Sequence, residues 1–162
     1  MLHEQYERMV KSRIEGRSNA LLSLQIRECL KYLAIISLTP GRRLPVTPDV
    51  DDVWHELILQ TRDYRELCST LPGAKFLDHE SIDPISYNER VGDSMFVKEW
   101  VQWVPDYVQN FGPFTEEAAE QWNVILFLRD EVGMSLDEIN ELGRTSEAEA
   151  IVPSSSPWSK IS

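Results

Sequence analysis

The stretch that decides the fold is VTPDVDDVWHELILQTRDYRELCSTL, residues 46–71. Thr47 offers an N-cap oxygen and Pro48 fits the first helical position, while the aspartates that follow suit the positive end of a helix dipole. Apolar residues then recur at helical spacing until a Pro-Gly pair stops the pattern. We therefore predict one unbroken helix over residues 48–70.

Similar local signals predict an all-α protein along the rest of the chain. Ser18, Thr115 and Ser135 are expected N-caps, the last as part of a capping box with Glu138. Pro105 removes a backbone hydrogen bond and is expected to kink its helix. The further expected helices cover 4–15, 19–37, 95–111, 115–132 and 135–142, the last ended by Gly143. The fold class is thus a compact bundle of about five to six helices.

The domain organisation follows from length and from the polar C-terminal end. A chain of 162 residues is long enough to bury a sizeable core, and we expect a single helical domain over residues 1–143. Residues 72–93 are expected to form an extended connection. Residues 144–162 are small and polar, so we expect a disordered, flexible tail. Trp158 in that tail is a candidate partner-binding anchor, because tryptophans often dominate interfaces.

Charge and hydropathy exclude several classes of partner. The formal net charge is −11, and Arg42–Arg43 is the only basic cluster. Nucleic-acid backbones and anionic membranes are bound through clustered Lys and Arg, so we expect no direct binding to either. The N-terminus lacks the apolar core of a signal peptide, and we expect a cytoplasmic protein with reduced thiols.

The cysteines do not complete a ligand cluster with the histidine of the opening stretch. His55 and Cys68 are thirteen residues apart, or about 20 Å along an unbroken helix, so they cannot share a metal ion there. Cys29 and Cys68 both lie on apolar stripes, which favours core packing over redox work.

Two interpretations of His55 remain open. In the first, His55 bonds Asp51 or Asp52 one turn back, or a loop carbonyl, and pins a neighbouring segment. In the second, His55 and His79 bind a divalent transition metal together with a carboxylate from Asp51, Asp52, Asp78 or Glu80. The spacing of these residues matches no distinctive ligand motif. No other cofactor is indicated.

The same segment resembles a known group of sequences. The matching residues are Val50, Asp51, Asp52, Val53, Trp54, His55, Ile58, Leu59, Thr61, Tyr64, Cys68, Gly73 and His79. They resemble the signature of an uncharacterised group related to the glycine-rich-domain-containing proteins. The chain departs from that signature at Leu67, where an aromatic is usual, and at Asp78, where the signature has a second histidine. The resemblance covers about thirty residues and implies a shared helical segment rather than a particular reaction.

Three functions are compatible with these patterns. The leading hypothesis is a small acidic module that binds and regulates another protein, since no catalytic constellation is evident. The alternative is a metal-binding protein or metal-dependent enzyme that uses His55 and His79. The third is a nucleic-acid mimic, because acids cluster at 49–52, 116–120 and 137–141, although such runs are usually solvated helix faces.

Overall fold

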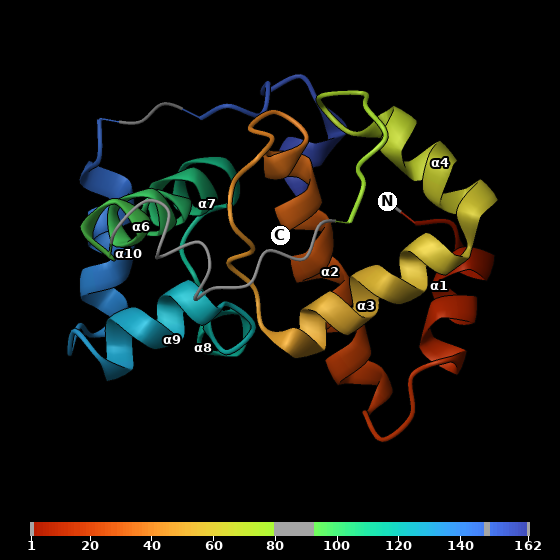
Figure 1. Ribbon diagram of the computed structural model, residues 1–162, viewed down its shortest axis with the longest axis horizontal. Helices are drawn as coiled ribbons and strands as arrows, with labels where there is room; N and C mark the ends of the chain where they lie inside the picture. The colour runs from red at the N-terminus through yellow and green to blue at the C-terminus, as the bar shows by residue number, and fades with distance from the viewer. Residues whose placement is uncertain (1, 80–92, 148–149, 162) are drawn as a thin grey trace.

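The protein is a bundle of α-helices, which confirms the all-α prediction. The computed structural model describes residues 2–79, 93–147 and 150–161, and this part of the chain contains no β-strand (Figure 1). None of the helices in these ranges has the length and apolarity needed to cross a membrane. The elements are α1 (Glu4–Ser12), α2 (Asn19–Ile36), α3 (Pro48–Leu59), α4 (Thr61–Thr70), α6 (Asp93–Val101), α7 (Trp103–Phe111), α8 (Glu116–Ala119), α9 (Asn123–Asp130), α10 (Leu136–Thr145) and the 3₁₀ helix η1 (Pro157–Lys160).

Helix α2 runs through the middle of the molecule, between α1, α3 and α4 on one side and α6 to α10 on the other (Figure 1). Both of its faces are covered, as expected for a helix with two apolar stripes. Its buried residues also include Gln25, Glu28 and Lys31, which periodicity did not single out. Glu28 pairs with Lys31 at 3.0 Å and accepts hydrogen bonds from Tyr107 and Trp122, so the core contains a charged network.

Four of the expected N-caps form. The side chains of Ser18, Thr47, Thr115 and Ser135 each accept a hydrogen bond from a backbone N–H in the first turn of α2, α3, α8 and α10 respectively. Ser135 and Glu138 complete the capping box. Local chemistry therefore fixes where these helices begin.

The prediction of one unbroken helix over residues 48–70 is wrong. The chain leaves helical geometry at Gln60 (φ −85°, ψ 68°), which separates α3 from α4. The buried Tyr6 hydroxyl donates a 2.7 Å hydrogen bond to the carbonyl of Leu57, which in a continuous helix would accept from Thr61. A side chain from α1 therefore takes up the carbonyl left at the break.

Two other expected helices are also divided, so the chain has more and shorter helices than the five or six predicted. Residues 95–111 divide into α6 and α7 just before Pro105, which cannot donate a backbone hydrogen bond to Val101. The helix from residue 115 divides at Trp122, which is extended and forms an isolated antiparallel bridge with Val46. That bridge holds the segment before α3 against the start of α9.

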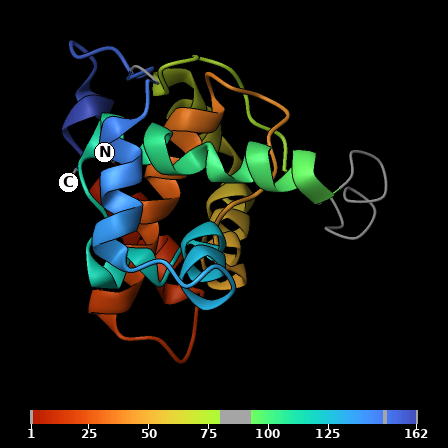
Figure 2. The same cartoon turned by 90° about the vertical axis from the view of Figure 1, so that its left-hand side faces the viewer.

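Helices α7 and α10 pack closely because a glycine lies between them (Figure 2). A Cβ atom at Gly143 would lie 2.6 Å from Val108 Cγ2, closer than real Cβ contacts. Gly143 was expected to end its helix, but α10 continues to Thr145. The glycine at this position therefore permits close packing rather than ending the helix.

The described part of the C-terminal segment packs on the bundle, which corrects the expectation of a disordered tail over 144–162 for those residues. Val152 is buried, and its backbone N–H donates to Asn110 Oδ1. Trp158 is 2% exposed, and its indole N–H donates to the carbonyl of Thr70 at the end of α4. An indole buried in this way is part of the core and is not an exposed partner-binding anchor.

Candidate metal centre

Three of the residues considered as metal ligands come together at one place. His79 Nε2 lies 2.7 Å from Asp51 Oδ1, and His55 Nε2 lies 3.5 Å from Asp51 Oδ2. One ligand atom from each of the three residues lies within 4.8 Å of the other two. The rings of His55 and His79 are 4.3 Å apart, so the carboxylate presents one oxygen toward each imidazole.

Helix α3 supplies two of these side chains. Asp51 and His55 are one turn apart on α3, which begins at the Thr47 cap and buries Val50 and Val53 in the core. Their spacing places them on one face of the helix. The Asp51 side chain is 20% exposed and that of His55 is 50% exposed, so the pair lies at the edge between the core and solvent.

His79 reaches the same place because the segment after α4 is held at two points. Gly73 donates its backbone N–H to Ser37 Oγ, and a Cβ atom there would lie 2.0 Å from the Ser37 carbonyl oxygen, so only glycine fits. Further along, Tyr64 donates a 2.6 Å hydrogen bond to the carbonyl of Leu77. The expected connection continues over residues 80–92, which lie outside the described residues.

Trp54 completes the support for His79. Its indole N–H donates to the Tyr64 hydroxyl at 3.0 Å, and its ring lies 4.4 Å from the His79 ring. The same tyrosine therefore bonds both the indole beneath the histidine and the segment that carries it. The sequence did not indicate this support, because the hydrogen bonds that link Trp54, Tyr64 and Leu77 join α3, α4 and the loop after α4.

The donor set fits a first-row transition metal. Two imidazoles and one carboxylate bind zinc in hydrolytic enzymes and iron in a class of oxygenases. Ligand atoms bonded to one ion at about 2.1 Å are about 3.0–3.4 Å apart in octahedral or tetrahedral geometry. The two imidazoles lie 2.7 and 3.5 Å from different oxygens of Asp51, and one ligand atom from each residue lies within 4.8 Å of the other two. The three side chains would have to draw closer around an ion to reach the separations of a bound state, and three ligands would leave further coordination positions for water or a ligand.

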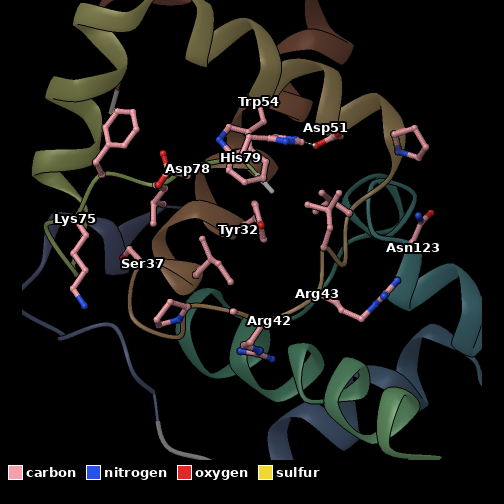
Figure 3. Close-up of a pocket in the computed structure, with 18 residues that line it drawn as sticks. Tyr32, Ser37, Arg42, Arg43, Asp51, Trp54, Lys75, Asp78, His79 and Asn123 are labelled. Carbon is pink, nitrogen blue, oxygen red and sulfur yellow. Dashed lines mark hydrogen bonds and ion pairs between the residues drawn. The ribbon is translucent and has the colours of Figure 1, made fainter. Parts of the chain in front are cut away.

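A pocket of about 520 Å³ adjoins this cluster (Figure 3). Asp51, Trp54 and His79 form one wall, and Arg42 and Arg43 from the loop after α2 lie across from them. Apolar side chains line much of the space between these walls. The residues concerned include Tyr32, Ile36, Leu44, Val46 and Leu77.

Asp52 does not join the cluster. It is exposed, and its carboxylate accepts a 2.8 Å hydrogen bond from Arg17. Helical spacing alone would place either carboxylate near His55, because Asp52 is three residues before it and Asp51 is four. The bond to Arg17 is what holds the Asp52 carboxylate elsewhere. Among the described residues, the ligand atoms that converge are therefore those of the predicted Asp51, His55 and His79, and Asp52 is not one of them.

Both cysteines lie in the core. Cys29 and Cys68 are 0% and 1% exposed, so the break in the helix does not bring Cys68 into the cluster. Burial, with a smaller contribution from the charge of Asp51, raises the pKa of the Cys29 thiol well above its ordinary range. A thiol that stays protonated is a poor nucleophile and a poor metal ligand.

Comparison of the chain with protein-family models, with curated proteins and with solved structures finds no match. The resemblance to the group related to glycine-rich-domain-containing proteins therefore remains a prediction.

Proposed function

We propose that this protein binds one divalent transition-metal ion through Asp51, His55 and His79. The observation that carries the proposal is the convergence of three ligand atoms within 4.8 Å, from a helix and a separate loop segment. A site with three protein ligands keeps a coordination position for water or substrate, as catalytic zinc and iron sites do. The proposed centre is therefore one at which a small ligand reaches the ion.

The support around the cluster favours this proposal over a simple loop attachment. Tyr64 already attaches the segment to the bundle through Leu77, and Gly73 attaches it through Ser37. Within the described residues, the half-exposed His55 adds little to that attachment, since its ion-pair partner there is Asp51 at 3.5 Å. A metal site explains why the second imidazole lies beside the carboxylate.

The test is metal content and metal titration of purified protein. We expect about one zinc, iron or cobalt ion per chain by elemental analysis. Co²⁺ should give the visible absorption bands of a nitrogen- and oxygen-ligated centre. His55→Gln and His79→Gln should weaken binding by more than the about 10- to 100-fold typical of outer-shell changes.

Two matched variants serve as controls. Asp52→Asn removes a carboxylate from the next position of the same helix, and His3→Gln removes the histidine that bonds Asp63. Both should leave metal binding unchanged. Substoichiometric metal in every preparation, or equal affinities in the His55, His79 and control variants, would refute the proposal.

Binding to another protein remains a prediction that is independent of this cluster. Its proposed anchor, Trp158, is buried, so a partner surface would have to involve other residues. Nucleic-acid mimicry has less support, because Arg17 pairs with Asp49 and Asp52, and Arg129 pairs with Glu116. Acids that are already paired with arginines are poor mimics of a free phosphate backbone.

A further inference from the structure

The pocket beside the cluster concentrates positive charge in an acidic protein. The chain has 27 acids against 16 Lys plus Arg, yet its only adjacent pair of basic residues, Arg42–Arg43, lines this pocket. Lys75, which is exposed, lines the same pocket. A basic cluster inside a concave site raises the local concentration of anions, whatever the net charge of the whole protein.

Once an ion is bound, the positive charges at the pocket outnumber the acids that the structure describes there. Among the described residues, Asp51 and Asp78 are the acids that line it, and Asp51 belongs to the proposed metal site. Asp106 approaches Arg42 at 2.5 Å, and the Arg42 guanidinium stacks over Trp103 at 3.9 Å, which fixes its position. Arg43 is 6% exposed, and its backbone N–H donates to Glu99. With the divalent ion in place, the described residues that line the pocket carry more positive than negative charge.

The remaining lining defines the body of a ligand. Tyr32 lies between the metal cluster and the arginine loop (Figure 3), and Trp54 and Leu77 add apolar surface to the lining. A volume of about 520 Å³ suits a small organic molecule rather than a polymer. Such a molecule would place an acidic group toward the basic wall and a second oxygen toward the ion.

We infer that the pocket binds a small organic anion, carrying a carboxylate or a phosphate group, that reaches the open coordination position of the metal ion. This inference rests on the proposed metal site. Carboxylate and phosphate groups both present negatively charged oxygens, and these oxygens are what the arginine side of the pocket would bind.

Calorimetric titration of the full chain, with and without added Zn²⁺, tests the inference. The probes are succinate and glycerol 3-phosphate, with succinamide and glycerol as their uncharged counterparts. We expect saturable binding of one or both anions to the zinc-loaded protein, weaker binding without zinc, and none of the uncharged molecules. The preferred anion shows which acidic group the pocket takes.

Variants separate the pocket from general electrostatic attraction. Lys75→Glu reverses an exposed charge at the pocket and should weaken anion binding about fivefold. Arg43→Gln should weaken it further. Lys98→Glu makes the same charge change at an exposed lysine elsewhere, on α6, and should leave binding unchanged.

The outcomes distinguish this inference from the proposed function. Zinc uptake without saturable binding of either anion would overturn the inference and leave the metal site standing. Equal weakening by Lys75→Glu and Lys98→Glu would also overturn it, because the effect would then come from net charge. Absence of zinc uptake would overturn the proposed function and this inference together.

Discussion

Replacing Tyr64 by phenylalanine tests the support of the metal centre directly. The Tyr64 hydroxyl accepts from the Trp54 indole at 3.0 Å and donates to the Leu77 carbonyl at 2.6 Å. Trp54 is 4% exposed, so its N–H would lose its partner without gaining water. A buried donor left unpaired costs about 1–3 kcal/mol, and the second bond contributes about 1 kcal/mol. Tyr64→Phe should therefore lower the free energy of unfolding by about 2–4 kcal/mol.

Urea denaturation of four proteins measures this effect and its cause. They are the wild type, Tyr64→Phe, Trp54→Phe and the double variant. In the Trp54→Phe background the indole donor is absent, so Tyr64→Phe should cost about 1–3 kcal/mol less there than in the wild type. Tyr64→Phe should also weaken metal binding, because the segment that carries His79 loses one of its two attachments. Equal costs in both backgrounds would refute the hydrogen-bond reasoning.

Further predictions concern the core. Glu28→Gln leaves Lys31 buried without its charge partner and should cost about 3–5 kcal/mol in urea denaturation. Gly143→Ala brings a Cβ against Val108 and should cost about 1–3 kcal/mol in the same assay. Cys29 should react with Ellman's reagent at about pH 8 only after unfolding, because burial raises its pKa. Above about pH 10, unfolding should become easier by up to about 1.4 kcal/mol per pH unit for each buried tyrosine, since the unfolded chain loses protons that the folded protein keeps. Absorbance of tyrosinate during an alkaline titration should therefore rise together with unfolding, and early independent ionisation would contradict this. The tyrosines whose pKa burial raises are Tyr6, Tyr32, Tyr64 and Tyr107.

The helix starts were predictable because their causes lie within a few residues. Ser18 and Thr47 each bond an N–H three residues later, so the cap is visible in the sequence itself. The helix breaks were less predictable because distant residues produce them. Tyr6 takes the carbonyl of Leu57, 51 residues away, and Val46 pairs with Trp122. Among these breaks, only the one before Pro105 was indicated by the local sequence, because proline has no backbone N–H to donate.

The candidate site was predictable in part for the same reason. The one-turn spacing of Asp51 and His55 indicated a shared face of a helix, and that is what α3 presents. His79 could be proposed only as a partner from a loop, because its position depends on the contact of Gly73 with Ser37. The burial of Trp158 was not predicted, because a lone aromatic in a polar segment gives no indication that its indole N–H donates to the distant carbonyl of Thr70.

The break at Gln60 helps to position the residues that support the site. Trp54 and Tyr64 are ten residues apart, which along an unbroken helix is about 15 Å, with the two side chains about 80° apart around the axis. Their 3.0 Å hydrogen bond forms because α4 turns back against α3 after residue 60. The turn that the sequence did not indicate therefore brings the tyrosine under Trp54. From there its hydroxyl also holds the segment that carries His79 to Asp51.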